Sequence, residues 1–431
     1  MIHLLKRFLP QDRFARNAII LAGGTGLGQS VVLLFSPLLT RLYTPTDFGL
    51  FSVYLSVLTM LIAIVSLKYE LAIPLPTENK TALNLVALSL MIVVIISLLV
   101  LLIVELFGVR LDQLINTENI SLNLWILPWS LLFAGINQAV SYWAIRNQRF
   151  GIIAQSRVNQ GLGQVVAQAS LGFLWHSPIG LFIGDLFSRI SSTAGLVIPS
   201  WKQDRKALSD EVTAESMREA GRKYKRFPLF SSWSGLLNIG GIQLPPILLI
   251  SLYDPHSAGL FALVQRVMGA PVTLISGSVS QVYIGEASQA LQSEDPSLIH
   301  LFKMTTRRLF KISALLLLAG LICPWVFPIL FGPDWSQAGC MAAIMAPTLA
   351  LQMIVSSISP SANLVGRQDI QLYGDAIRLI LVVLSLYGAH ALGSSPTEAV
   401  AFYSLGMVLT YIAFFFGYRY VVYSFSVEEV R

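Results

Sequence analysis

The chain has 431 residues, of which 55% are hydrophobic and 12% are charged, and its formal net charge is +6. A soluble domain carries about 25% charged residues, so this composition excludes a soluble globular protein and predicts an integral membrane protein. The basic excess does not indicate nucleic-acid binding, because lysine and arginine lie in short gaps between apolar runs, where they report orientation.

Twelve apolar runs are long enough to cross a bilayer, which takes about 20 residues in a helix. In chain order they cover 18–39, 48–67, 82–107, 121–145, 151–174, 178–200, 228–252, 258–284, 309–331, 338–359, 370–391 and 397–421. We therefore expect an all-α membrane protein with twelve transmembrane helices, since barrel strands would be about ten residues long and would alternate. A polar stretch divides six spans from six, which predicts an N-terminal lobe at 1–200, a cytoplasmic linker at 201–227 and a C-terminal lobe at 228–431.

Two segments repeat each other at the start of the second span of each half. They read Leu42-Tyr43-x-Pro45-x-x-x-Gly49-Leu50-Phe51 and Leu252-Tyr253-x-Pro255-x-x-x-Gly259-Leu260-Phe261. Two further echoes keep the same order, Leu106-Phe107-Gly108 with Leu330-Phe331-Gly332, and Arg146/Arg157 with Arg367/Arg378. Together they indicate a duplicated unit of about half the chain. Six spans per half make the halves parallel repeats, which in membrane proteins usually form two lobes around a central pathway.

Charged residues inside the spans are rare and point to function, because a charge at mid-bilayer is costly. Asp185 and Arg189 are four residues apart in span six. This spacing suits either a structural ion pair or an arginine that faces a cavity and is positioned there by the aspartate. Arg266 has no acid three or four residues away, so we expect it to contact a ligand. Arg41 ends span one and is either a second cavity cation or a residue that reaches the interface.

Polar residues form a stripe along one face of span five. Its members are Arg157, Gln160, Gln164 and Gln168. This face lines a hydrated cavity with Asp185 or supplies interhelical hydrogen bonds. Lys68 and Glu70 at the cytoplasmic end of span two form an inner gate pair or an interfacial anchor.

Several kinds of site are absent from the sequence. There is no phosphate-binding loop motif, and no Cys/His spacing suited to a metal. The run Gly23-Gly24-x-Gly26-x-Gly28 resembles a dinucleotide fingerprint only in its letters, because no strand precedes it; small residues there allow helices to approach closely or allow one helix to bend. No catalytic constellation is evident, so we expect neither an enzyme nor a cofactor.

Several motifs resemble those of the polysaccharide-biosynthesis flippases of the multidrug/oligosaccharidyl-lipid/polysaccharide exporter superfamily. They are Leu39-Thr40-Arg41-Leu42-Tyr43-Thr44-Pro45 through Phe48-Gly49, Tyr69-Glu70-Leu71-Ala72-Ile73-x-Leu75-Pro76, Tyr224-x-x-Phe227-Pro228, Asn238 and Gln243-Leu244-Pro245. The resemblance covers nearly the whole chain. It implies a V-shaped bundle of two pseudo-symmetric six-helix lobes, with Arg41 and Arg266 as substrate contacts; Arg189 is a third candidate cation from its place in span six.

The resemblance also implies a function, the flipping of an undecaprenyl-pyrophosphate-linked oligosaccharide to the outer leaflet for O-antigen, capsule or exopolysaccharide synthesis. The expected partners are membrane lipids, a coupling ion (H⁺ or Na⁺), a polysaccharide polymerase and a chain-length regulator. The chain lacks the two extra helices of lipid II flippases in the superfamily. The alternative is an ion-coupled drug antiporter of the same superfamily.

The distribution of basic residues predicts the orientation. Most of the 29 lysine and arginine residues lie at the N-terminus or in even-numbered gaps, whereas the opposite side holds Arg41 and Arg110. Both termini should therefore be cytoplasmic, in a bacterial inner membrane. Reporter fusions within 201–226 and after Arg431 should report the cytoplasm, and fusions near Asp334 the outside. A single inversion in that order would contradict the twelve-span arrangement.

Overall fold

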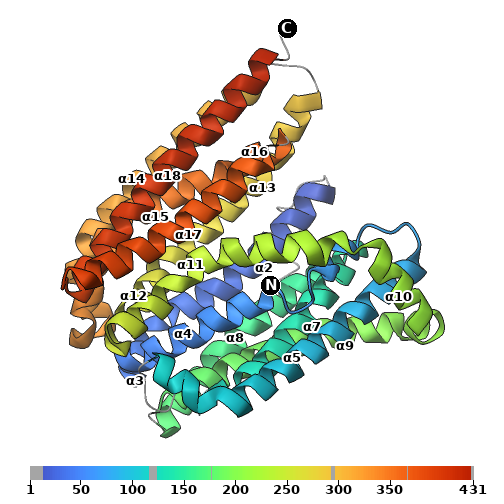
Figure 1. The fold of residues 1–431 in the computed structure, drawn as a ribbon, viewed down its shortest axis with the longest axis horizontal. Helices are drawn as coiled ribbons and strands as arrows, with labels where there is room; N and C mark the ends of the chain where they lie inside the picture. The colour runs from blue at the N-terminus through green and yellow to red at the C-terminus, as the bar shows by residue number, and fades with distance from the viewer. Residues whose placement is uncertain (1–12, 116–123, 176, 293–296, 366, 429–431) are drawn as a thin grey trace. The chain divides into compact units, whose positions relative to one another are not determined.

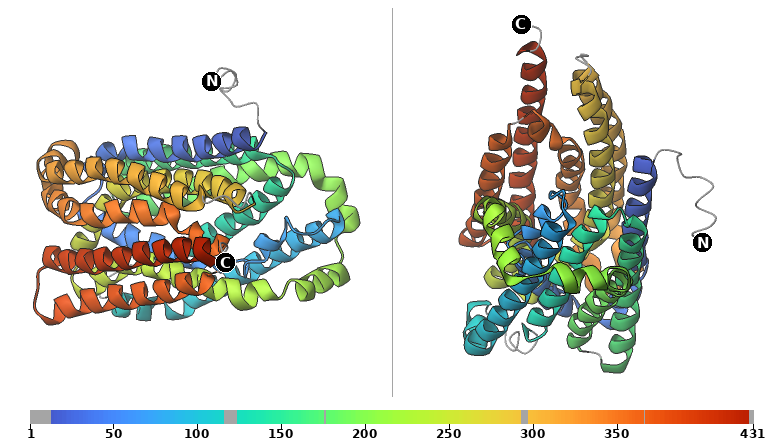
Figure 2. Two further views of the ribbon diagram at one scale, coloured as in Figure 1. Left: turned by 90° about the horizontal axis from the view of Figure 1, so that it is seen from above. Right: turned by 90° about the vertical axis from the view of Figure 1, so that its right-hand side faces the viewer.

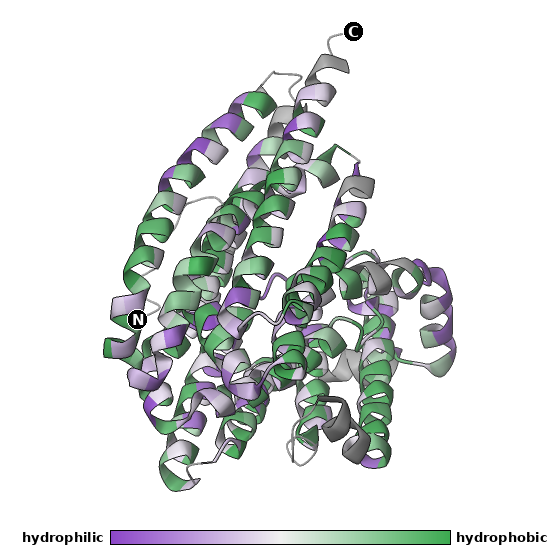
Figure 3. Cartoon of the chain, turned by 60° about the vertical axis from the view of Figure 1, so that its left-hand side comes forward, coloured by the Kyte–Doolittle hydropathy of each residue, from purple (hydrophilic) through white to green (hydrophobic). Residues whose placement is uncertain are grey.

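The chain folds into long helices that fit the predicted membrane spans (Figure 1). The structure, a computed structural model, describes residues 13–115, 124–175, 177–292, 297–365 and 367–428. Within these ranges the regular secondary structure is helical, without β-strands, as the run lengths predicted. Figure 3 shows hydrophobic residues along most of the length of these helices, with hydrophilic residues at several helix ends.

Among the described residues, ten helical segments are long and apolar enough to cross a membrane. The other two predicted spans are also helices, α7 (Leu127–Arg146) and α8 (Phe150–Trp175). They are more polar than the ten because α8 carries the Arg157–Gln168 stripe and α7 carries Asn137 and Gln138. Apolar composition alone therefore does not identify as membrane spans the helices whose polar side chains face the protein interior.

The helices group into two compact units. Unit 1 comprises Met1–Tyr43 and Tyr54–Ile239, and unit 2 comprises Thr44–Val53 and Gly240–Arg431. Helix α4 (Pro45–Ile62) and helix α11 (Ser232–Leu252) each contribute to both units. The first turns of α4 therefore pack with the C-terminal half of the chain. The boundaries at 200 and 228, set by the polar linker, stay a prediction.

Unit 1 is built around α8. Its other main helices are α2 (Arg13–Leu34), α3 (Ser36–Leu42), α5 (Asn79–Ile115), α7, α9 (Ile179–Glu211) and α10 (Ala214–Lys223). Helix α8 packs on α2 and α9. Helices α2 and α8 lie close together because glycines of α2 face α8. A Cβ added to Gly24 would lie 2.5 Å from Cα of Ala154, and a Cβ added to Gly28 would overlap the carbonyl of Arg157. The glycine run thus brings helices together, as predicted.

Unit 2 is built around α15 (Ser336–Ile358). The remaining helices are α12 (Pro255–Val264), the π-helical turn η3 (Gln265–Gly269), α13 (Ala270–Gln292), α14 (Ser297–Phe331), the turn η4 (Pro333–Trp335), α16 (Pro360–Leu364), α17 (Gln368–Ala391) and α18 (Pro396–Glu428). Helix α15 packs against α12, α13, α14 and α18, and many of its small and methionine side chains are buried. Figure 2 shows α14, α15, α17 and α18 lying side by side from two further directions.

Three expected spans differ in detail from the structure. Span one divides at Phe35 into α2 and α3, with Pro37 in the first turn of α3, where a proline fits a helix best. Span two ends at Ile62 instead of 67, and it is followed by turns in which Leu67 and Lys68 adopt positive φ angles of 50° and 63°, which a right-handed helix cannot include. Helix α9 continues to Glu211, so the start of the predicted linker is helical.

The two copies of the repeated motif contact each other inside unit 2. A Cβ on Gly49 would overlap the carbonyl of Pro255, and a Cβ on Gly259 would overlap the carbonyl of Pro45. The same added atoms would lie 3.1 Å from N of Gly259 and 2.9 Å from N of Gly49. The contact is therefore reciprocal, as expected for duplicated segments that meet around a pseudo-two-fold axis. Both positions need glycine because the helix backbones touch there.

This contact predicts the effect of one added methyl group. Gly49→Ala should lower the melting temperature of the purified protein, by an amount that reflects about 1–3 kcal/mol of overpacking. Gly388→Ala in α17 is the matched control, since nothing lies within 4 Å of a Cβ added there. Thermal unfolding in detergent measures both. Equal melting temperatures for the two variants would show that α4 and α12 do not pack backbone to backbone.

Candidate functional site

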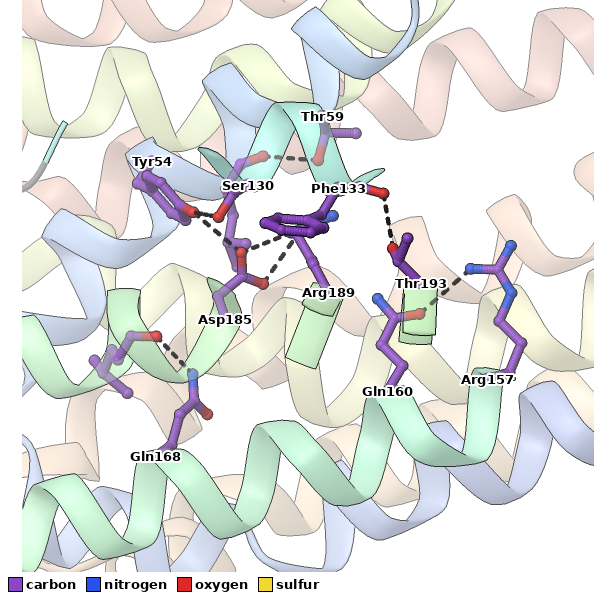
Figure 4. A network of polar contacts seen from close by, with 12 residues as sticks. Tyr54, Thr59, Ser130, Phe133, Arg157, Gln160, Gln168, Asp185, Arg189 and Thr193 are labelled. Carbon is purple, nitrogen blue, oxygen red and sulfur yellow. Dashed lines mark hydrogen bonds and ion pairs between the residues drawn. The ribbon is translucent and has the colours of Figure 1, made fainter. Parts of the chain in front are cut away.

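Helix α9 places an ion pair inside unit 1. The Nε of Arg189 donates to Oδ2 of Asp185 at 2.7 Å, and Nη2 donates to Oδ1 at 3.2 Å (Figure 4). The side chains of Asp185 and Arg189 are 5% and 13% exposed. The four-residue spacing seen in the sequence thus produces a nearly buried pair with two hydrogen bonds. Such a pair is costly to break, because either partner alone would be an uncompensated charge.

Two further helices reach the same carboxylate. The hydroxyl of Tyr54 on α4 lies 3.1 Å from Oδ2 of Asp185 and 2.6 Å from Oγ of Ser130 on α7. The single hydrogen of the Tyr54 hydroxyl can be donated to Oγ of Ser130 or to Oδ2 of Asp185, so this tyrosine links α4 to both α7 and α9. Figure 4 shows the three side chains turned toward one another. Tyr54 and Ser130 are neutral and far from Asp185 in sequence, so no sequence pattern identified them.

The polar stripe on α8 divides into two parts. Nη1 of Arg157 donates to Oε1 of Gln160 at 3.3 Å, near the cytoplasmic end of the predicted span. Gln168 is fully buried; its Nε2 donates to the carbonyl of Leu181, and its backbone carbonyl accepts the hydroxyl hydrogen of Tyr43. Gln168 therefore supplies hydrogen bonds between helices, and whether it also lines a cavity stays a prediction. Gln164 is half-buried between the two parts.

Arg266 lies in unit 2 on the π-helical turn η3, directly after α12. Its Nε and Nη2 are buried, and no hydrogen-bond partner within the described part of the chain reaches either atom. Its Cζ lies 5.8 Å from the ring centroid of Phe48, and that ring packs edge-on against Trp335 at 5.1 Å. π-helical turns are frequent at functional sites. Two buried, unsatisfied guanidinium donors next to an aromatic face make Arg266 the clearest candidate for binding an anion.

Arg41 differs from the other two candidate cations. It lies in the last turn of α3, and its side chain is exposed. An arginine at the end of a transmembrane helix often extends to the interface, which was one of the two expected roles. The geometry around Arg41 adds nothing that favours a ligand.

Lys68 and Glu70 lie in the non-helical segment between α4 and α5. Glu70 is fully buried; Oγ of Ser66 and Nε2 of Gln138 donate to its carboxylate, the latter at 2.8 Å. Nζ of Lys68 is farther away, 4.0 Å from Oε1 of Glu70. Glu70 therefore fixes its own segment to α7, which an exposed interfacial anchor would not do. Whether the pair gates a pathway stays a prediction.

The same segment is tied to the linker. The hydroxyl of Tyr69 donates to the carbonyl of Gly221 in α10 at 3.0 Å. Burial raises the pKa of this hydroxyl, which keeps it a protonated donor at neutral pH. Position 235 on α11 also approaches Lys68, since a Cβ added to Gly235 would lie 3.2 Å from Cε of that lysine. The Lys68–Glu70 segment thus contacts both α10 and the start of α11.

A second buried ion pair, on α17, was not among the predicted site residues. Nη2 of Arg378 lies 3.0 Å from Oδ1 of Asp375 on α17, and the two side chains are 8% and 10% exposed. Two opposite charges three residues apart within an apolar run were a sufficient signal, because the same rule identified Asp185 and Arg189. Within the described residues, no cluster of three His, Cys, Asp or Glu side chains that could hold a metal ion is present.

The Asp185–Arg189 pair gives a double-variant test. Asp185→Asn or Arg189→Gln alone should lower the amount of folded protein in the membrane, because removing one partner of a buried pair costs about 3–5 kcal/mol. The double variant should restore it. Arg41→Gln is the control and should leave abundance unchanged, since that arginine is exposed. Normal abundance of both single variants, measured by fluorescence-detected size exclusion, would show that the pair is not a buried structural contact.

Comparison with known proteins places these residues in a family context. The family model described as "Polysaccharide biosynthesis protein" matches residues 14–284, more than half of the chain. No protein with a curated description matches it by sequence.

Several solved structures share its fold. A lipid II flippase MurJ in an inward closed conformation aligns with a TM-score of 0.71 and 13% identity, over 96% of this chain and 90% of that one. An inward-facing multidrug resistance MATE family transporter of the MOP superfamily aligns with a TM-score of 0.66 and 12% identity, over 95% and 98%. A MOP superfamily transporter from Pyrococcus furiosus aligns with a TM-score of 0.63 and 14% identity, over 95% and 96%. At these identities the likeness shows the fold alone, which this chain shares with the three membrane proteins.

Proposed function

Since the chain belongs to the polysaccharide biosynthesis protein family, we propose that it flips a polyprenyl-pyrophosphate-linked oligosaccharide from the inner to the outer leaflet by alternating access. The observation that carries this proposal is Arg266, a buried guanidinium with two donors that no described residue satisfies. The product would be a sugar unit available outside the membrane for surface polysaccharide synthesis.

Arg266 suits a pyrophosphate for two reasons. A guanidinium presents a planar fork of N–H donors that matches two phosphate oxygens, and charge-assisted bonds of this kind are stronger than neutral ones. Its setting, with the Phe48 ring on one side and no hydrogen-bond partner among the described residues for Nε or Nη2, also leaves the charge poorly compensated until an anion arrives. A buried cation of this kind is costly, and a bound dianion would remove most of that cost.

Unit 1 also carries polar residues of the kinds that bind phosphate and sugar. Arg189 is a second cation, but it can bind a phosphate only by loosening its bonds to Asp185. Arg157, Gln160 and Gln164 share one face of α8 and offer donors and acceptors for sugar hydroxyls. We assign them to the oligosaccharide and not to the lipid, because an isoprenoid tail has no polar atoms beyond its pyrophosphate.

The proposal places the protein in the inner membrane of a bacterium with both termini in the cytoplasm. A pyrophosphate carries negative charge outward, which an inside-negative membrane potential favours by about 2.3 kcal/mol per charge for each 100 mV. A coupling ion, H⁺ or Na⁺, would add to this driving force. A polymerase and a chain-length regulator would then act on the flipped units.

The alternative is an ion-coupled drug antiporter, which the likeness in fold to a MATE family transporter supports. Such a mechanism needs a carboxylate that binds and releases the coupling ion, H⁺ or Na⁺, during transport. Asp185 lies inside a predicted span of unit 1, but Arg189 and Tyr54 both donate hydrogen bonds to its carboxylate, so it is not free for a coupling ion. Arg266 would also repel a cationic drug. We therefore favour the anionic, lipid-linked substrate.

Arg266 provides the test of this function. In a strain that depends on this protein for its surface polysaccharide, Arg266→Ala should abolish export and leave the protein at normal abundance. Arg266→Lys should retain part of the activity, because it keeps the charge but loses the fork. The measurement is surface polysaccharide by immunoblot, with lipid-linked units followed in the same cells.

Arg308→Ala in α14 is the matched control, since that arginine is exposed and should be dispensable. Accumulation of lipid-linked units behind Arg266→Ala would support the proposal. Full polysaccharide export by Arg266→Ala would remove Arg266 from the substrate site and contradict the assignment.

A further inference from the structure

Two helices of unit 2 bring positive charges to one aromatic ring. Nζ of Lys303 on α14 lies 5.6 Å from the ring centroid of Tyr423 on α18. Cζ of Arg419, one turn before that tyrosine, lies 5.3 Å from the same centroid. Both cations are exposed, and so is Arg307, one turn along α14 from Lys303. Because a ring face attracts cations, Tyr423 holds two of them, from separate helices, at one place on unit 2.

Packing fixes α14 and α18 against each other next to this ring. The ring centroid of Phe415 on α18 lies 6.1 Å from that of Phe302 and 6.0 Å from that of Phe310, both on α14. The two helices also contact each other through their backbones. The helix positions that carry Lys303 and Arg419 are therefore set by packed neighbours, which distinguishes this cluster from basic residues on a loop.

The cations lie at the depth of lipid headgroups. The apolar run 309–331 begins two residues after Arg307 and six after Lys303, a rise of about 3 and 9 Å along the helix. Arg419 and Tyr423 lie at the end of the apolar run 397–421, and both helix ends belong to the predicted cytoplasmic side. A headgroup layer is about 5 to 8 Å thick on each side of a bilayer, so these basic side chains end within it or beside it.

The surface next to the cations is apolar. The side chains of Phe310 on α14 and Phe416 on α18 are 48% and 57% exposed, and Leu315, further along α14, is also exposed. Both helices are among those long and apolar enough to cross a membrane, so these side chains face lipid chains. Cations at a headgroup depth beside exposed apolar side chains match an amphiphile that has a negative headgroup.

The charges of the cluster are not compensated within the protein. Among the described residues, the ion pairs involve other side chains, and none includes Lys303, Arg307 or Arg419. Basic clusters between membrane helices on the cytoplasmic side are typical binding sites for anionic lipid headgroups. The cluster thus has the charge, the depth and the apolar surroundings that such a headgroup requires.

We propose that α14 and α18 bind an anionic phospholipid of the inner leaflet, with Lys303, Arg307 and Arg419 as phosphate contacts and Tyr423 as their positioning residue. The occupant is a lipid of the bilayer, because the three cations are exposed and adjoin lipid-facing side chains, where phospholipids are always present. The site is separate from Arg266, which is buried, and it does not rest on the proposed function.

Native mass spectrometry of the full-length protein, titrated with phosphatidylglycerol in detergent, measures this binding. Phosphatidylcholine with the same acyl chains is the reference without net charge. The wild type should bind phosphatidylglycerol at least about tenfold more tightly than phosphatidylcholine. The double variant Lys303→Gln with Arg419→Gln should lower the affinity for phosphatidylglycerol about 25-fold, because each basic residue next to an anionic lipid contributes about fivefold.

A double variant on α10 is the matched control. Arg218→Gln with Arg222→Gln removes the same charge from exposed side chains. Glu215 and Glu219 are exposed on that helix, each three residues before one of these arginines, and already offset their charge. This variant should therefore stay within about threefold of the wild-type affinity for phosphatidylglycerol.

Two variants of Tyr423 separate positioning from charge. Tyr423→Leu keeps every cation but removes the ring, so it should bind phosphatidylglycerol more weakly. Tyr423→Phe keeps the ring and should bind like the wild type. Equal affinities of the leucine and phenylalanine variants would contradict the role of the ring.

Three results would overturn the site. Equal losses in the α10 and α14/α18 double variants would show a general attraction of basic surface, and a wild type without preference for phosphatidylglycerol would exclude the site without any variant. Undecaprenyl pyrophosphate is the third probe: if it displaces phosphatidylglycerol at equal concentration, the site takes the transported lipid and not a phospholipid of the bilayer. Each of these results leaves the test of the proposed function at Arg266 unchanged.

Discussion

A charge inside an apolar helix bundle must be compensated, and most of the polar architecture of this protein follows from that constraint. Asp185 and Arg189 neutralise each other on α9, Asp375 and Arg378 do so on α17, and Glu70 is covered by donors from Ser66 and Gln138. Arg266 departs from the pattern, with two buried donors that no described residue meets. An uncompensated cation inside a membrane helix is the group that a site for an incoming anion would contain.

Helix α4 connects this electrostatic pattern to the duplicated architecture. Its first turn contains one copy of the repeated motif, and Gly49 in that motif packs on the backbone of the other copy at Pro255 and Gly259. Its middle contains Tyr54, which bonds to the acid of unit 1. The same helix is therefore fixed by backbone contact in one unit and by a polar bond in the other.

Much of the fold could be predicted from the sequence because membrane spans are local features. Run length identified the helices, and the repeated motif indicated the duplication. The early end of α4 was missed, because the turns that follow Ile62 lie within the same apolar run and leave no trace in hydropathy. In the candidate site, spacing was enough for Asp185 and Arg189. Tyr54, Ser130 and Phe48 were not predictable, since neutral side chains from separate helices meet only after packing.

The central claim is that a pyrophosphate-linked sugar lipid crosses the membrane through this protein. Purified protein reconstituted into liposomes, with a fluorescent undecaprenyl-pyrophosphate-linked sugar in both leaflets, measures this directly by dithionite quenching of the outer leaflet. The account predicts that the inner-leaflet pool becomes accessible in liposomes that contain the protein, and that its Arg266→Ala variant leaves this pool protected. A protected inner pool in wild-type liposomes that instead transport a cationic dye against an ion gradient would contradict it.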